Sequence, residues 1–417
     1  MKKRKMNTID LFAGCGGLME GFEQTGHFRT VACVEWEKAP LLNLKNRLMT
    51  KWGYENTDEI AIRFDIQRTE DLLKGWQNDA DFGSCIGMDA IVKKHGEIDL
   101  IIGGPPCQAY SVAGRIRDVN GMKEDYRNYL FESYLKIVNR YKPKAIVFEN
   151  VQGMLSAAPD GTPIINKIRQ SFLNEGYMLL ENFSDAVFDV SEYGIPQKRK
   201  RVVIFAVKIE TYGDKSLNIV KEFYNVTTKK QKVFKQRTVQ EAISDLPKLL
   251  PSEKEYSVNG KKYSHESSKE GVANHISRFH SKRDIEIFKL LTKDIEDEKY
   301  KYIDTKILNQ LYFEKTGKVT NVHKYHVLRR NLPSNTIPAH LYKDGLRHIH
   351  PDSSQARTIT VREAARLQTF PDDYIFQGGM MEQYRMIGNA VPPLFSKVIA
   401  TAVKELLEKY EVNENVI

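Results

Sequence analysis

Residues 103–111 read GGPPCQAYS, and they directly follow the apolar stretch IDLII at residues 98–102. A short apolar run of this kind is typical of a buried parallel strand. The two glycines allow a sharp turn and the close approach of a ligand, and the two prolines then stiffen the backbone. Cys107 therefore lies on a rigid turn at the end of a strand, a position suited to a nucleophile. The alternative is a small apolar cysteine that packs against the turn. Basic residues soon follow (Arg115, Arg117), which favours the nucleophile, because reactive cysteines occupy electropositive surroundings.

The N-terminal segment predicts a second ligand-binding turn. Residues 8–12, TIDLF, predict a strand, and residues 13–17, AGCGG, a glycine-rich turn before a helix that ends near Gly26. Strand, glycine turn and helix together open a nucleotide-type α/β fold, in which a cofactor lies against the backbone. The spacing is not G-x-G-x-x-G and no Lys-Ser/Thr pair follows, so a phosphate cradle is not predicted. A purely structural turn is the alternative.

Two later strands end in acidic residues. Residues 30–34 end at Glu35 and Trp36, and residues 61–64 end at Asp65. An acidic residue after the second strand commonly binds ribose hydroxyls, and an indole can cover an adenine face. Asp65 could accept a hydrogen bond from an adenine amino group, or it could cap the next helix.

A carboxylate and two arginines follow further strands. Residues 145–148 predict a strand ending at Glu149, which places this carboxylate at the same sheet edge as Cys107. Its alternative role is that of partner to a helix N-terminus. Arg199 and Arg201 enter the strand predicted at residues 202–207 and share one face of it. They could form a solvated face, contact a phosphate, or bind a carbonyl oxygen of a base.

The rest of the chain divides into less regular segments. We expect helix and irregular chain at residues 69–96 and a hairpin at residues 177–188. From Lys208 to about Gly345 the α/β rhythm gives way to basic clusters with interleaved tyrosines and histidines, which predicts an inserted domain facing a polyanion. The remaining predicted helices lie at residues 129–141, 164–175, 361–370 and 394–410.

Composition limits the class of protein. The 417 residues suggest two or three domains, and the net charge of +9 favours polyanionic partners. The cysteines at positions 15, 33, 85 and 107 show no metal-ligand spacing, so we expect reduced thiols and no metal site. No signal-like segment and no run of about 18 apolar residues is present, so a cytoplasmic protein without a membrane span is expected.

Taken together, these stretches resemble the ordered motifs of the C5-cytosine DNA methyltransferase family, of the bacterial restriction–modification type. The motifs that carry the resemblance are residues 10–22, 104–108, 149–151, 197–201, 357–374 and 383–393. The resemblance implies an α/β, Rossmann-like, S-adenosylmethionine-dependent methyltransferase domain at residues 1–207 and 346–417, whose C-terminal segment packs back on the N-terminal part. The inserted, smaller target-recognition domain would then be residues 208–345.

The resemblance also implies roles for individual residues. The Cys107 thiolate would add to C6 of a cytosine flipped out of duplex DNA, Glu149 would protonate N3, Arg201 would bind O2, and Arg199 would support the loop. Gln108, Ser111 and Arg115 would contact the DNA. The residues implied for S-adenosyl-L-methionine are Phe12, Ala13, Gly14, Gly16, Gly17, Glu35, Trp36, Asp65, Ile66, Gly104, Pro106, Leu130, Asn389 and Val391.

Two other functions remain open at this point. One is the tRNA-directed relative of the family, against which the sizeable insert argues. The other is a catalytically silent DNA-binding protein, which should have lost Cys107 or Glu149. The expected partners are double-stranded DNA and a cognate restriction endonuclease, and a monomer is expected. The base that removes the C5 proton, the target sequence and the contacts of the insert are not identified by the sequence.

Overall fold

A computed structural model of the chain describes residues 4–106, 130–158, 161–258, 260–269, 271–320, 325–343 and 345–411. These residues pack as two units, each with its own core. The first unit contains Met1–Tyr193, Arg199–Phe234 and Ala390–Ile417. The second contains Gly194–Lys198 and Lys235–Asn389.

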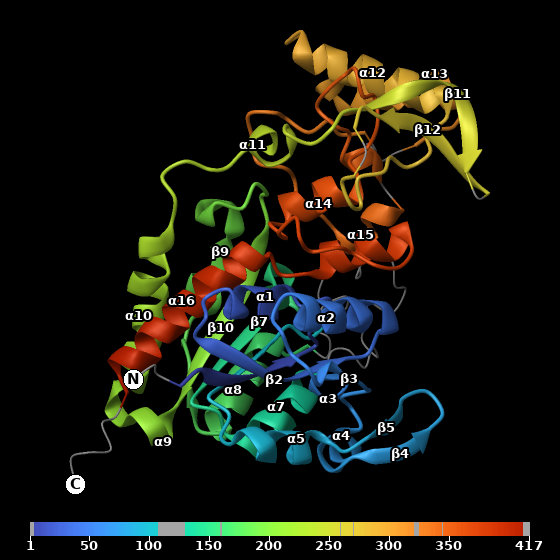
Figure 1. Cartoon of the computed structure of the whole chain (residues 1–417). Helices are drawn as coiled ribbons and strands as arrows, with labels where there is room; N and C mark the ends of the chain where they lie inside the picture. The colour runs from blue at the N-terminus through green and yellow to red at the C-terminus, as the bar shows by residue number, and fades with distance from the viewer. Residues whose placement is uncertain are drawn as a thin grey trace. The chain divides into compact units, whose positions relative to one another are not determined.

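The first unit is built on a mostly parallel sheet (Figure 1). Its strands are β1 (Met6–Leu11), β2 (Phe28–Glu35), β3 (Ala61–Arg63), β6 (Leu100–Gly103), β7 (Ala145–Val151), β8 (Tyr177–Met178), β9 (Val187–Asp189) and β10 (Lys200–Lys208). The order is β3-β2-β1-β6-β7-β10-β8, with β9 also paired to β10. The first five strands in this order run parallel, and β10 is antiparallel to β7. The predicted α/β fold is confirmed.

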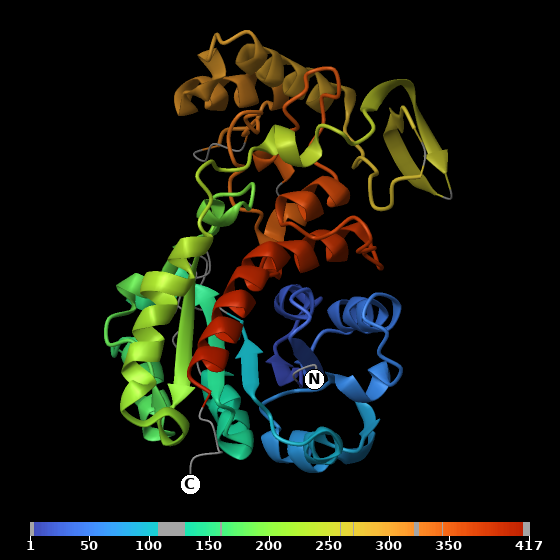
Figure 2. The same ribbon diagram turned by 60° about the vertical axis from the view of Figure 1, so that its left-hand side comes forward.

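Helices cover this sheet, and the last one comes from the far end of the chain. The helices are α1 (Gly17–Glu23), α2 (Lys38–Thr50), α3 (Thr57–Ile60), α4 (Thr69–Lys74), α5 (Met88–His95), α7 (Leu130–Tyr141), α8 (Ile164–Asn174), α9 (Ile209–Tyr212), α10 (Ser216–Glu222) and α16 (Pro393–Lys409). Figures 1 and 2 show α16 beside α1. The Ser396 hydroxyl donates to the Leu18 carbonyl at 2.5 Å. A Cβ on Gly21 would lie 2.4 Å from the Lys397 nitrogen, so glycine permits this close packing.

Two local predictions differ from the structure. The hairpin predicted at residues 177–188 is wrong, because β8 and β9 each pair with β10 and not with each other. Between them the Asn182 side chain accepts from the Ser184 amide at 3.0 Å and starts a short 3-10 helix instead of a hairpin turn. Residues 69–96 contain, besides α4 and α5, an antiparallel hairpin of β4 (Trp76–Asp79) and β5 (Gly83–Cys85). This hairpin departs from the helix and irregular chain that the sequence predicts here.

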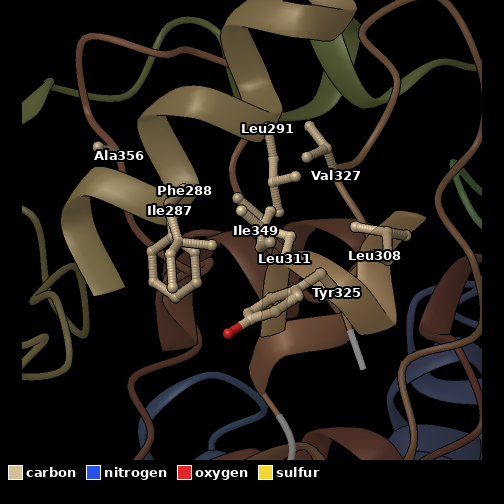
Figure 3. Packing of buried hydrophobic residues seen from close by; sticks show 9 residues of the cluster. All are labelled: Ile287, Phe288, Leu291, Leu308, Leu311, Tyr325, Val327, Ile349 and Ala356. Carbon is tan, nitrogen blue, oxygen red and sulfur yellow. The ribbon is translucent and has the colours of Figure 1, made fainter. Parts of the chain in front are cut away.

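The second unit is mainly helical. Its elements are α11 (Val239–Ile243), β11 (Leu249–Val258), β12 (Lys261–Ser267), α12 (Lys282–Glu296), α13 (Thr305–Thr316), α14 (Val361–Leu367) and α15 (Met380–Asn389). Apolar side chains of α12 and α13 meet those of the following loops in a buried cluster (Figure 3). The cluster is formed by Ile287, Phe288, Leu291, Leu308, Leu311, Tyr325, Val327, Ile349 and Ala356.

The division by packing differs from the predicted functional division. Residues 346–389, including α14 and α15, pack with the second unit. Packing within the protein does not show which residues contact DNA. The assignment of residues 208–345 to target recognition therefore stays a prediction.

One helical segment, Met380–Lys409, is long and apolar enough by composition to cross a membrane. However, 72% of its apolar window is buried within the protein, as in the core helix of a folded domain. Pro392 and Pro393 also divide it into α15 and α16.

Candidate active site

The turn that leads to Cys107 starts at the centre of the sheet. Two glycines without side chains allow it to pack closely against the neighbouring strands. In β6, Gly103 is paired with Leu11 of β1 and with Phe148 of β7. A Cβ on Gly103 would lie 2.4 Å from the Leu11 carbonyl oxygen, and a Cβ on Gly104 would lie 2.8 Å from Oε2 of Glu149. Larger residues would therefore push this turn away from the edge of the sheet.

The end of β7 fixes the same turn by a hydrogen bond. The Asn150 side-chain amide donates to the Pro105 carbonyl at 3.3 Å. Sequence reasoning gave Asn150 no role, although its position directly after Glu149 was the available signal. The predicted nucleophile Cys107 and the predicted DNA contacts Gln108, Ser111 and Arg115 lie outside the described residues.

Glu149 and Arg201 form an ion pair beside this turn. The antiparallel register pairs Glu149 with Val203 and places Arg201 opposite Val151. Nε of Arg201 lies 2.9 Å from Oε1 of Glu149, and the two side chains are 13% and 12% exposed. The carboxylate is thus almost buried, but the pair keeps some access to solvent.

The charge of Glu149 depends on opposing effects. Burial raises the pKa of its carboxyl group above the ordinary value, while the positive charges of Arg201 and Arg199 lower it. The net direction is upward, which suits a carboxyl group that gives up a proton. Arg199 is buried and donates to the Ala390 carbonyl at 3.1 Å. It therefore ties the start of β10 to the segment before α16.

The glycine turn after β1 has a backbone conformation that lets a ligand approach the main chain closely. Gly14 and Gly16 adopt positive φ angles of 57° and 84°. Phe12 also has a positive φ, 60°, which is uncommon for a bulky residue and marks strained backbone. Such strain concentrates where a binding site requires it.

The carboxylate at the end of β2 is held in place by backbone groups. One oxygen of Glu35 accepts from the Gly14 amide at 2.8 Å, and the other accepts from the Glu37 amide at 2.7 Å. Each oxygen keeps a second lone pair, so the side chain is oriented but still able to bind hydroxyl groups. Burial raises the pKa of Glu35, an effect that these amides oppose. Trp36 next to it is half exposed.

Asp65 does not cap the helix that follows it. Its carboxylate accepts from the Gln67 amide at 3.0 Å, which closes a short turn after β3. The N-cap position of α4 is Arg68. The structure therefore excludes the helix-cap alternative for Asp65.

The remaining predicted cofactor residues of the first unit lie after strand ends or at helix starts. These are Ala13 after β1, Gly16 before α1, Ile66 after β3, Pro106 after β6 and Leu130 at the start of α7. Val391 also belongs to this unit, whereas Asn389, the last residue of α15, belongs to the second. In open parallel sheets, ligands bind at this carboxyl edge.

Gly17 is expected to be intolerant of a side chain. A Cβ at Gly17 would lie 2.4 Å from the Val391 carbonyl oxygen and 3.1 Å from the Ala390 Cβ. Because backbone must move, Gly17→Ala should lower the free energy of unfolding by about 1–3 kcal/mol. Chemical denaturation measures this loss. Gly379→Ala is the control, since its added methyl meets only the Glu382 side chain, at 3.6 Å. Equal stability of both variants would contradict the packing argument.

Within the described residues no group of three or more His, Cys, Asp or Glu side chains is placed to hold a metal ion. A mostly parallel sheet with a glycine turn after its first strand and an oriented carboxylate at the end of its second is the arrangement that nucleotide-type α/β folds share. The Glu149–Arg201 ion pair lies beside the turn that follows β6.

Comparison with known proteins identifies the family. A family model described as C-5 cytosine-specific DNA methylase matches residues 6–405. The chain is 34% identical over 456 residues to the type II methyltransferase M.Bpa9945I of Bacillus paralicheniformis, covering 96% of this chain and 99% of that protein. It is 30% identical to the type II methyltransferase M.DdeI of Desulfomicrobium norvegicum, covering 99% and 91%. The chain therefore belongs to the C-5 cytosine-specific DNA methylase family and is a DNA (cytosine-5)-methyltransferase, as the motifs predicted.

Solved structures agree with the fold. A DNA modification methyltransferase encoded within an E. coli prophage superposes with a TM-score of 0.63 at 23% identity, covering 97% of this chain and all of that one. The S. pombe Dnmt2 methyltransferase gives a TM-score of 0.55 at 16% identity, covering 98% of this chain and 100% of that one. At these identities the similarity supports the α/β fold alone.

Proposed function

We propose that this enzyme transfers a methyl group from S-adenosyl-L-methionine to C5 of a cytosine that is flipped out of duplex DNA, through a covalent bond between Cys107 and C6. The observation that carries the proposal is the Glu149–Arg201 pair, 2.9 Å apart, next to the turn that leads to Cys107. Glu149 on β7 can donate a proton, and Arg201 on the neighbouring β10 carries a guanidinium. These two groups match the two polar atoms of cytosine that such a reaction must bind, N3 and O2.

The residues of the first unit fit the cofactor. The Glu35 carboxylate, oriented by the Gly14 and Glu37 amides, would bind the ribose hydroxyls. Trp36 would cover a face of the adenine, and Asp65 would accept from the adenine amino group. The turn that contains Phe12 and Gly14, both with positive φ angles, would let the cofactor lie against the backbone at the carboxyl edge of the sheet. S-adenosyl-L-methionine supplies an electrophilic methyl group when bound.

The chain's own groups would first make the base reactive. Cytosine C5 is a poor nucleophile, so the Cys107 thiolate would form a bond to C6 while Glu149 gives its proton to N3. The π electrons of the C5=C6 double bond then become available at C5, while the single bond between the two carbons remains. Arg201 would stabilise the charge that develops at O2, and Arg199 would hold the start of β10 in place. After C5 is methylated, a base takes the C5 proton, the bond from sulfur to C6 breaks, and N3 returns its proton to Glu149.

Extruding the base from the duplex costs a few kcal/mol, which contacts between the enzyme and the DNA must offset. We propose that residues 208–345 supply contacts to the duplex, with side chains that read bases in the major groove and basic residues that bind phosphates. The net charge of +9 supports a polyanionic substrate. Because the compared relatives are named type II methyltransferases, we further propose that the enzyme protects host DNA alongside a restriction endonuclease. We also propose that it acts in the cytoplasm as a monomer.

Conversion sequencing of plasmid DNA from cells that express the chain tests this function. We expect protected cytosines within one short motif, and no protection with Cys107→Ser. Protection that persists in Cys107→Ser would overturn the covalent mechanism. No protection in either sample would overturn the DNA assignment and direct the assay to tRNA. Trapping on DNA that contains 5-fluorocytosine would show the covalent adduct directly. With fluorine at C5 there is no proton for a base to remove, so the enzyme is not released.

A further inference from the structure

The β4–β5 hairpin carries a phenylalanine at a firmly held tip. Phe82 lies in the turn between the two strands, directly before β5. The Asp79 carboxylate accepts from the amides of Asp81 and Phe82 at 2.9 and 3.0 Å. Arg68 donates to the same carboxylate at 2.6 Å. The tip is thereby fastened to the segment that follows β3.

Aromatic rings continue this attachment toward the cofactor side of the sheet. Phe64, 1% exposed, stacks on Trp76 with ring centroids 3.8 Å apart and meets the Phe82 ring at 5.0 Å. Phe82 in turn meets Trp36 edge to face, with centroids 6.2 Å apart and an interplanar angle of 79°. Arg63 lies over the Phe82 ring at 5.2 Å and donates to the Asp81 carbonyl at 2.6 Å. The hairpin therefore presents one fixed ring to the Trp36 indole.

Trp36 needs such a support. It follows the end of β2 and is 50% exposed, so little of its indole is held by the core. Among the described residues, Phe82 is the one aromatic ring that contacts it. The register pairs Glu35 with Arg63, and the Phe64 amide donates to the Glu35 carbonyl at 3.2 Å. The aromatic cluster thus adjoins both strand ends that carry the proposed adenosine-binding residues.

We propose that the tip of the β4–β5 hairpin is a positioning device for the adenine of the cofactor. Phe82 acts through Trp36: its ring holds the indole in one orientation before the adenine arrives. A preset side chain loses less conformational freedom on binding, so cofactor affinity rises without any change in the methyl-transfer step. Phe82 is a positioning residue, and this role rests on the proposed function of Trp36.

The test compares cofactor binding with turnover. Phe82→Ala should raise the KM for S-adenosyl-L-methionine and the Kd for S-adenosylhomocysteine by about three- to ten-fold, the value of one aromatic pair. At saturating cofactor, kcat should stay within about two-fold of the wild type, because the lost binding affects the ground state and the transition state equally. Phe82→Tyr, which keeps the ring, should restore both constants. Phe82→Leu keeps apolar volume without the ring and should resemble Phe82→Ala, so it decides the matter if Phe82→Ala does not fold.

Met49→Ala is the control, since Met49 belongs to the same unit, is 54% exposed and lies outside the proposed sites, and it should leave KM and Kd unchanged. Unchanged KM and Kd in folded Phe82→Ala would overturn the proposal, and so would a fall in kcat at constant KM. Failure of the proposed function would look different. In that case the wild type itself would not bind S-adenosylhomocysteine in calorimetry.

Discussion

Glu149→Gln is expected to lower kcat by about 10²–10⁴-fold, the usual contribution of a positioned general acid. Glutamine has nearly the same shape and can still accept a hydrogen bond from Arg201, which lies 2.9 Å from the carboxylate in the wild type. It cannot give a proton to N3, so the addition of Cys107 to C6 would lose its driving force. Methyl transfer to DNA in single-turnover experiments measures this loss without interference from product release.

The control is Glu192→Gln. Glu192 also belongs to the first unit and is ion-paired to a basic side chain, Lys232, but it lies outside the proposed site. This variant should keep kcat within about two-fold of the wild type, as expected of a surface substitution. If Glu149→Gln retained most of its activity while binding S-adenosylhomocysteine normally, the assignment of Glu149 as the acid would be wrong.

The pH profile gives an independent check of the same residue. Burial raises the pKa of Glu149, and the nearby arginines only partly oppose this. The acid must be protonated to act, so kcat/KM should fall as the pH rises through its pKa in the free enzyme. That decline should be absent from the residual activity of Glu149→Gln. A wild-type and variant profile of the same shape would assign the decline to another group.

Much of this site could be predicted because its parts are local in sequence. Glu35, Asp65 and Glu149 each follow a short apolar run, and parallel strands bring their carboxyl ends to one edge. Two turns were also recognisable from composition: the glycine turn at residues 13–17 and the Gly-Pro turn before Cys107. Such clusters of glycine and proline are rare outside turns with a special backbone conformation.

The pairings across the fold could not be predicted in the same way. The contact of Arg201 with Glu149 depends on the antiparallel register of β10 against β7, which no local pattern specifies. The Asn150 hydrogen bond to Pro105 depends on how two strand ends meet. Phe82 lies in a segment without clear periodicity, and its contact with Trp36 follows from a hairpin tip fastened by Asp79 and Arg68. Tertiary contacts decide all three.

The second unit is expected to lose several kcal/mol of stability when the pH falls from 7 to 5. It buries four histidines whose pKa values are strongly lowered, mainly by loss of solvation. They are His265, with a pKa of about 4, and His280, His348 and His350, each with a pKa of about 3. All four are thus neutral in the folded protein over this pH range.

Their surroundings explain why they stay neutral. Nε2 of His265 bonds to the Gln355 carbonyl at 2.9 Å, and this contact raises the pKa of His265, but burial lowers it by more. The His265 ring meets that of His280 edge to face at 5.8 Å. Nδ1 of His350 accepts from the Asp352 amide at 3.2 Å. Arg357 is also buried here and pairs with Glu363 at 2.7 Å, and its charge lowers the pKa of His265, His280 and His350. Among the described residues, Glu363 lies 3.4 Å from His350, and Glu363 and Asp352 both raise the pKa of His350 without outweighing burial.

The sign of the effect follows from proton binding. In the unfolded chain these histidines have a pKa of about 6.5, so below that pH the unfolded state binds more protons than the folded state. Stability is therefore present above about pH 6.5 and is lost as the pH falls toward the folded pKa values. At pH 5 each histidine contributes a loss of at most about 2 kcal/mol. The buried carboxyls of Asp10, Glu35 and Glu149 have raised pKa values, so in the first unit their effect has the opposite sign.

Hydrogen exchange of peptides from each unit between pH 7 and 5, corrected for intrinsic exchange, separates the two effects. As the pH falls from 7 to 5, we expect the protection of amides in α12 and α14 to decrease. The protection of amides in β1 and β7 should not decrease in parallel. His280→Gln removes one titrating group, so the stability of the second unit should change with pH less steeply, by about 1.4 kcal/mol per unit below pH 6. His27→Gln, at an exposed site, should leave the slope unchanged. The slope decides the outcome even if His280→Gln is less stable at every pH. An unaltered slope would mean that the His280 ring takes up its proton without unfolding.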